Sequence, residues 1–216
     1  MKIYDAAMGP YPARVRIALA EKNMQSQVEF VPVDLLQGEH KAAPFREKNY
    51  SGTLPLLELD DGTYIAECTA ITQYLDTLDG APTLTGITPV EQGLIHMMNK
   101  RAELEFLDAI STYFHHATPG LGPDVERFQN RDWGLYQRDK ALAGMRYFDG
   151  IFQRRAFVAC DFFSMADITV IGGLIFAGYL DVTIPAECEA LASWYAKMQE
   201  RASVKNRITM SDPPSS

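Results

Sequence analysis

Cysteine is scarce in this sequence, and long apolar runs are missing from it. The three cysteines, Cys68, Cys160 and Cys188, are odd in number, widely spaced and without a CxxC pair. This pattern argues against a disulfide framework and a zinc site, so we predict no bound metal and a reducing, cytoplasmic location. Nothing approaches the run of about 18 apolar residues that a membrane helix needs, and the N-terminus lacks the apolar segment of a signal peptide. We expect neither a membrane span nor a membrane partner.

Positive charge is also in short supply. The 216 residues carry 20 lysines and arginines against 28 aspartates and glutamates, a formal net charge of −8, and no basic run is present. Such a surface repels a phosphate backbone, so we do not expect nucleic acid as a partner. What the chain does have is 47% hydrophobic residues. That is enough for one large domain or two smaller ones with real cores.

The first part of the chain alternates between strand and helix signals. Pro12 suits the first helical position, where its missing N–H costs nothing. Asp60-Asp61-Gly62 between two apolar runs predicts a hairpin. The expected elements are a strand at 2–4, a helix at 14–22, a strand at 28–33, a short helix near 41–47, hairpin strands at 54–59 and 63–66, and a helix at 68–78.

The second part of the chain reads as helix throughout, after a linker-like stretch of glycine, proline and threonine. Ser164-Met165-Ala166-Asp167 is a capping-box signature. The expected helices cover 90–115, 133–152, 164–180 and 187–200. We therefore predict an α+β chain in two domains: residues 1–79, a linker at 80–89, an all-helical domain at 90–207 and a disordered tail at 208–216.

Two short stretches point to a ligand. Pro55 stands at the front of an apolar strand, and a cis Leu54–Pro55 bond would turn the Leu54 backbone toward a ligand; a trans proline that starts an edge strand explains the same pattern. Glu67 and Cys68 fall where a helix begins, and free N–H groups there attract an anion. With a carboxylate beside them they match a free amino-acid end. The alternative is that Glu67 only complements the helix dipole.

The order of four motifs resembles that of cytosolic glutathione transferases, in the bacterial and fungal, yeast-type branch. The motifs are GPYPARVRIALAEK at 9–22, GTLPLL at 52–57, DDG at 60–62 followed by Glu67-Cys68, and SMAD at 164–167. The resemblance covers nearly the whole chain. It implies a thioredoxin-like N-terminal domain with a mixed four-stranded sheet, an all-α C-terminal domain, and glutathione as co-substrate.

The resemblance also implies the glutathione-binding residues. Pro55 would be the cis-proline, and Leu54 would pair its backbone with the cysteinyl part of glutathione. Glu67 would hold the γ-glutamyl ammonium, and the N–H of Cys68 the γ-glutamyl carboxylate. Lys41 and His40 would meet the glycyl carboxylate, although a solvated lysine is the ordinary fate of a lone Lys. Cys68 replaces a serine of the family, so a hydroxyl bond is lost unless Thr69 compensates.

The family's thiol-activating residue is missing. Its slot before the proline of the first helix holds Gly9, yet a thiol with a pKa of about 8.5 needs activation at neutral pH. The helix N-terminus itself is one substitute and the phenol of Tyr11 another, although plain packing is the more ordinary role for Tyr11 than catalysis. The third is Ser111 with a histidine of 115–116 that holds a water. We favour His116, because it precedes Ala-Thr-Pro as a histidine does in related segments; His115 closing its helix is the ordinary alternative.

An electrophile pocket is expected at Met8, Phe106, Tyr113 and Phe114, although aromatic residues at helical spacing often form core. The partners would be glutathione and a small hydrophobic electrophile. We also expect a homodimer. Tyr50 would be an aromatic key at its interface, as in some relatives, and an ordinary buried or surface tyrosine explains this residue equally well.

Two classes of function follow. The first is an enzyme in which the glutathione thiolate attacks a hydrophobic electrophile; a glutathione-dependent peroxidase or disulfide reductase would use the same thiolate. The second is a non-catalytic interaction protein on the same fold, for which Gly9 and Cys68 are the best support.

Overall fold

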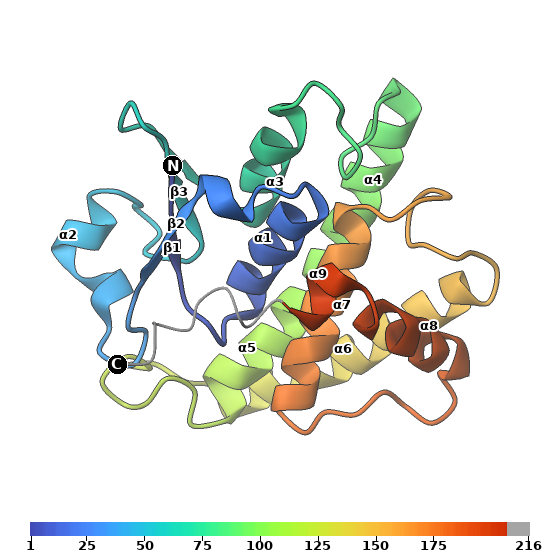
Figure 1. Ribbon diagram of the computed structural model, residues 1–216. Coiled ribbons are helices and arrows are strands. Elements are labelled where there is room, and N and C mark those ends of the chain that lie inside the picture. The colour runs from blue at the N-terminus through green and yellow to red at the C-terminus, as the bar shows by residue number, and fades with distance from the viewer. Residues whose placement is uncertain (207–216) are drawn as a thin grey trace.

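A four-stranded mixed sheet forms the N-terminal part of the computed structural model, which describes residues 1–206 (Figure 1). The order is β2-β1-β3-β4, in which β1 runs parallel to β2 and antiparallel to β3, and β4 pairs with β3 as a hairpin. The predicted thioredoxin-like sheet is thereby confirmed, whereas the predicted disordered tail lies outside the described residues. The strands are β1 (Lys2–Asp5), β2 (Glu29–Pro32), β3 (Leu56–Glu58) and β4 (Tyr64–Ala66).

Helices cover both faces of this sheet, and the alternation of side chains along the strands decides which helix meets which face. Ile3 and Leu57 are buried with α1 and α3, whereas the neighbouring Tyr4 and Leu56 pack with Phe45 of α2. The helices are α1 (Pro10–Glu21), α2 (Ala43–Arg46) and α3 (Cys68–Thr77), with 3₁₀ turns η1 (Gln25–Gln27) and η2 (Glu39–Lys41) between them.

The first helix begins earlier than predicted. Pro10, not Pro12, occupies its first position, and Gly9 is the extended N-cap. The prediction was wrong because two prolines fit the first turn of a helix, where neither N–H has an intrahelical partner. The difference matters, because it places the N-terminal end of α1, and with it the positive end of the helix dipole, directly after Gly9.

The C-terminal part is helical, as predicted. The long helix expected at 90–115 is interrupted by a π-helical turn, η3, of the kind that often occurs at functional sites. The elements are α4 (Pro89–Ala102), η3 (Glu103–Leu107), α5 (Asp108–Ala117), α6 (Arg131–Phe152), α7 (Met165–Tyr179), α8 (Glu189–Gln199) and α9 (Ala202–Lys205). No helix within residues 1–206 has the length and apolar character needed to span a membrane.

The predicted capping box at the start of α7 is present. Asp167 accepts hydrogen bonds from the backbone N–H and the hydroxyl of Ser164, both at 2.9 Å, and from the backbone N–H of Val158 at 2.9 Å. The box therefore fixes the beginning of α7 and also ties the preceding loop to it.

Helix α1 lies between the sheet and the helical part. Ile17 and Ala18 on one side belong to the core of the helices, while Val15 and Leu19 on another belong to the core under the sheet. Figure 1 shows α1 with α3 on the side of the sheet that faces α4, α5 and α7. The two parts thus share a helix, and a cleft opens where its N-terminus meets α5.

Candidate functional site

A cavity of about 780 Å³ lies in this cleft, between the N-terminal and the helical part. Its wall on the sheet side consists of residues 6–12, 33–36, 40–41 and 52–54. The opposite wall comes from α5, from residues 120–121 and 125–126 of the loop after α5, and from the end of α7. The cleft brings together the start of α1 and the predicted residues of the first long helical segment.

The start of α1 explains why the usual hydroxyl is missing. A Cβ on Gly9 would lie 2.8 Å from Cδ and 3.0 Å from Cγ of Pro12, and 3.2 Å from the carbonyl oxygen of Ala6. The proline ring cannot swing away, so any side chain at Gly9 requires a backbone shift. What remains at the cavity is the helix N-terminus. Pro10 and Pro12 have no N–H and the N–H of Ala13 donates to Gly9, so the dipole and the single N–H of Tyr11 are what favour an anion such as a thiolate.

The Leu54–Pro55 bond is cis, and strand β3 begins only after it, at Leu56. Leu54 lines the cavity, together with Lys41 and His40 from η2. The ammonium of Lys41 donates to the carbonyl oxygen of Gly52 at 2.9 Å, which ties η2 to the loop before β3. His40 is only 4% exposed, and its Nδ1 is buried without a hydrogen-bond partner among residues 1–206. Burial, assisted by the charge of Lys41, lowers the pKa of His40.

Glu67 and Cys68 stand where the sequence places them, at the N-terminus of α3. Glu67 is exposed and has a φ of 68°, a left-handed conformation at which few residues other than glycine are found. Cys68 is buried, and its thiol donates to the carbonyl oxygen of Tyr11 at 3.3 Å. Thr69 cannot replace the lost serine hydroxyl, because its own hydroxyl donates to Glu103 at 2.9 Å. Only the backbone N–H groups of this turn are left for an anion.

Tyr11 and Ser111 both lie at the cavity, but the phenol is already engaged. Tyr11 donates to Asp108 Oδ1 at 2.8 Å, across the two parts of the molecule. Burial and then the charge of Asp108 raise the pKa of Tyr11, so the phenol stays protonated. Ser111 is 8% exposed and lies one turn after Asp108 on α5. The contacts therefore assign the Tyr11 proton to Asp108, and the hydroxyl of Ser111 lies beside the same phenol.

The two histidines at the end of α5 have opposite hydrogen-bonding states. Nδ1 of His115 lies 2.6 Å from Glu126 Oε1 and must donate, since a carboxylate only accepts. Nδ1 of His116 accepts the backbone N–H of Asn130 at 3.0 Å, so its proton is on Nε2. Both residues line the cavity. Neutral His115 can therefore accept a proton at Nε2, whereas neutral His116 can only donate there.

Two of the four expected electrophile residues line the cavity, and two do not. Met8, 65% exposed, and Phe114 are at the wall. Phe106 is fully buried, with its ring against Gly173 of α7, because the π turn directs it into the core. Tyr113 lies outside the lining and instead has the guanidinium of Arg138 over its ring at 5.9 Å. The prediction of Phe106 and Tyr113 as pocket residues was wrong.

Sequence reasoning missed an aromatic wall at the end of α7. Phe176 meets Phe114 edge-on at 5.3 Å and stacks with Tyr179 at 6.1 Å, and all three line the cavity. Phe176 and Tyr179 have i, i+3 spacing on the strongly apolar helix α7, and in the sequence this spacing indicated only burial. Sequence reasoning also missed Glu126, because no pattern marks its loop.

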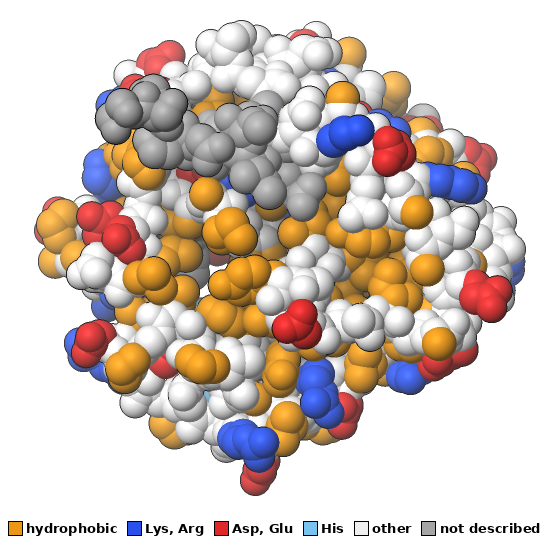
Figure 2. Space-filling view, turned by 60° about the horizontal axis from the view of Figure 1, so that its bottom comes forward, with side chains coloured by type: hydrophobic (Ala, Val, Ile, Leu, Met, Phe, Trp, Pro, Cys, Tyr) orange, Lys and Arg blue, Asp and Glu red, His pale blue; other side chains and the backbone are white. Residues whose placement is uncertain are grey.

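Hydrophobic side chains fill much of the middle of the face in Figure 2, with charged ones mainly toward its edge.

The matched family and the site define the class of the protein. The glutathione S-transferase, N-terminal domain, matches residues 8–78, the segment that contains the start of α1, the cis-proline and Glu67. Together with the relatives below, this shows that the chain belongs to the glutathione S-transferase family, whose members are transferases with glutathione as co-substrate.

The particular relatives are close. The chain is 68% identical over 208 residues to glutathione S-transferase 2 of Saccharomyces cerevisiae, which covers 96% of this chain and 89% of that protein. The crystal structure of Gtt2 from Saccharomyces cerevisiae superposes with a TM-score of 0.95 over 96% of this chain and all (100%) of that one. A glutathione S-transferase domain-containing protein of Marinobacter aquaeolei is 50% identical, with a TM-score of 0.92 and 94% of this chain covered against 100% of its own. A glutathione S-transferase from Methylobacillus flagellatus, solved with GSH bound, is 26% identical, with a TM-score of 0.79 and coverage of 95% and 98%.

Proposed function

We propose that this protein is a glutathione transferase that conjugates the glutathione thiolate to small hydrophobic electrophiles, and that it activates the thiol without a hydroxyl at the start of α1. The observation that carries the proposal is the cavity itself. It joins a bare helix N-terminus at Gly9, a cis-proline loop and a column of polar side chains on α5.

Glutathione would bind along the sheet side of the cavity. The Leu54 backbone would pair with the cysteinyl part, and Pro55 would hold that backbone in place. Glu67 and the N–H of Cys68 would bind the γ-glutamyl end, and Lys41 with His40 the glycyl carboxylate. This pose directs the sulfur to the N-terminus of α1 and to α5, where charge can be stabilised as it forms.

The proton of the thiol would go to His115, with Ser111 holding the water or sulfur in place. The tautomers support His115 over the sequence-based choice of His116, because His115 keeps a free acceptor nitrogen and His116 does not. His116 would act instead as a donor at the cavity wall, and Tyr11 as the group that holds Asp108. The electrophile would rest on Phe114, Phe176 and Tyr179 near Met8, an apolar and aromatic wall.

The test is an ultraviolet titration of the thiolate of glutathione bound to the protein. We expect the bound thiol to ionise at least one pH unit below the free value of about 8.5. His115→Ala should abolish most of that shift, while His116→Ala should leave more than half of it. A bound thiol that ionises like the free one, or no binding of glutathione, would contradict the proposal and favour a non-catalytic member of the fold.

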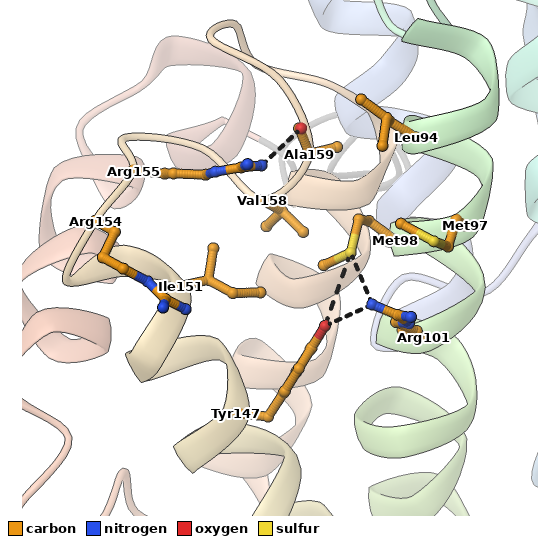
Figure 3. Close-up of a pocket in the computed structure, with 10 residues that line it drawn as sticks. All are labelled: Leu94, Met97, Met98, Arg101, Tyr147, Ile151, Arg154, Arg155, Val158 and Ala159. Atoms are coloured by element: carbon orange, nitrogen blue, oxygen red, sulfur yellow. Dashed lines mark hydrogen bonds between the residues drawn. The ribbon is translucent and has the colours of Figure 1, made fainter. Parts of the chain in front are cut away.

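We also propose a cytoplasmic homodimer in which Tyr50 of each copy enters a pocket of the other. Tyr50 is 85% exposed. A second cavity of about 490 Å³ lies between α4 and α6, with an apolar floor that includes Met97, Met98 and Val158 (Figure 3). Exposed Val90 and further side chains of α4 extend the same apolar face. An aromatic ring fits this floor, and the rim supplies cations: Arg101, Arg154 and Arg155.

Light scattering after gel filtration tests the dimer. We expect twice the chain mass for the native protein and a shift toward monomer for Tyr50→Ala, because an exposed aromatic that fills a partner's pocket dominates such interfaces. Tyr179→Ala removes another exposed tyrosine, 59% exposed, from the cleft and should leave the mass unchanged. A native protein that elutes as a monomer contradicts the proposal.

A further inference from the structure

Glu126 lies at the cavity, where its carboxylate contacts the ring of His115. It comes from the loop that follows α5 and reaches back to the ring of His115, with 2.6 Å between Nδ1 and Oε1. The carboxylate side chain is 11% exposed and the imidazole 39% exposed. A partly buried pair of this kind interacts more strongly than a pair in open solvent.

The loop is built to hold this carboxylate in place. Oε1 of Glu126 also accepts the backbone N–H of Leu121 at 3.0 Å, and the N–H of Glu126 itself donates to the carbonyl oxygen of Gly122 at 2.9 Å. Gly120 has a φ of 58°, and a Cβ on it would lie 2.5 Å from Oε1. Glycine is thus required there both for the turn and for the approach of the carboxylate.

The groups around this pair come from three elements. His40 and Lys41 of η2 act electrostatically on it from the sheet side, and Asp108 lies two turns before His115 on α5. Glu126 is the carboxylate in hydrogen-bond contact with the imidazole. A carboxylate in that position fixes the ring tautomer, with the proton on Nδ1.

We propose that Glu126 is the positioning residue of thiol activation: it holds the Nδ1 proton of His115 and thereby keeps Nε2 as the proton acceptor for glutathione. The inference rests on the proposed function, in which His115 is that acceptor. In the step, the S–H bond breaks, the sulfur keeps the electron pair as thiolate, and the proton forms a new N–H bond at Nε2. The resulting imidazolium is stabilised by the negative charge of Glu126.

The experiment is the same titration of bound glutathione, carried out on Glu126→Gln. The amide can still accept from Nδ1 but has no charge, so we expect the midpoint of thiol ionisation to rise by about one pH unit, a tenfold change in the ionisation equilibrium. Asp124→Asn removes the same charge from an exposed position two residues away in the loop and should leave the midpoint in place. Glu126→Asp, which keeps the charge but shortens the reach, is the second variant if the glutamine protein does not fold.

A double-mutant cycle distinguishes positioning from a general effect of charge. In a His115→Ala background, Glu126→Gln should add no further shift, because Glu126 acts through the imidazole. An unchanged midpoint in Glu126→Gln, or a full shift that persists without His115, overturns the proposal. If the bound thiol of the native protein shows no lowered midpoint, the proposed function itself fails. That result differs from a lowered midpoint that Glu126→Gln leaves unchanged, which overturns only the role of Glu126.

Discussion

Gly9 shows how a single missing side chain determines the chemistry open to the site. Any Cβ there would press on the Pro12 ring at 2.8 Å, and overpacking of this kind costs about 1–3 kcal/mol. We predict that Gly9→Ser lowers the free energy of unfolding by that amount in urea titrations and does not lower the midpoint of thiol ionisation. Gly93→Ser, where a Cβ meets nothing within 4 Å, is the control. A serine variant with normal stability and a more acidic bound thiol would refute this explanation of the empty slot.

Cys68, which stands where the family has a serine, is the other departure from the family pattern at the residue scale. Burial raises the pKa of its thiol to about 11, so the reactive thiolate is a small fraction at neutral pH. We predict that a maleimide at pH 7 leaves Cys68 unlabelled in the folded protein and labels it in urea, as read by peptide mass spectrometry. Labelling of native Cys68 at the rate of free cysteine would show that the site is open. The thiol thus serves packing and a bond to the Tyr11 carbonyl.

The capping box of α7 carries a prediction at the scale of the element. Burial raises the pKa of Asp167 to about 6 from its ordinary 3.8, although three donors hold the carboxylate. The folded state therefore binds the proton more tightly than the unfolded chain, so this group's contribution to stability is full below about pH 3.8 and is lost as pH rises toward 6. The loss is on the order of 3 kcal/mol.

We predict that Asp167→Asn removes this slope from a plot of unfolding free energy against pH, as measured by urea denaturation between pH 4 and 7. Glu189→Gln, in the first turn of α8, is the control and should keep the slope. If the unfolding free energy of the wild type and of Asp167→Asn changed with pH by the same amount in this window, the assignment to Asp167 would be contradicted.

The elements also show how far sequence reasoning reaches. The strands, the amphipathic helices and the Ser164–Asp167 box follow from local patterns, and the cis bond before Pro55 from a family motif. The π turn has no such pattern, so the placement of Phe106 and Tyr113 was wrong. Glu126 and Tyr179 could not be found either, because their roles depend on contacts between segments distant in the sequence, which local periodicity does not encode.

At the scale of the whole molecule, a buried polar network holds the two parts together. Arg14 of α1 donates to Glu103 at 2.9 Å and to Asn99 at 3.2 Å, and Asn99 accepts from Thr169 at 2.6 Å. The guanidinium side chain is 4% exposed and the carboxylate 15% exposed. Neither charged group is exposed enough for water to take the place of its partner.

We predict that Arg14→Leu destabilises the protein by about 3–5 kcal/mol, because it leaves the Glu103 charge buried without its partner. The double variant Arg14→Leu with Glu103→Gln should recover a large part of that loss in urea unfolding. Arg146→Leu, which breaks an exposed pair with Glu187, should cost less than about 1 kcal/mol. Equal effects of the two single changes would argue against a network that joins the parts.

The π turn at Glu103–Leu107 lets this helical segment carry one residue more than a regular α-helix would over the same span. The N–H of Asp108 donates to the carbonyl oxygen of Glu103, five residues earlier, so the extra residue is taken up within the turn. Asp108, Ser111 and His115 then follow on the cavity side of α5. In evolutionary terms, an insertion that is absorbed in this way reshapes one turn of the helix at the edge of the cleft and leaves the phase of the rest of the helix in place.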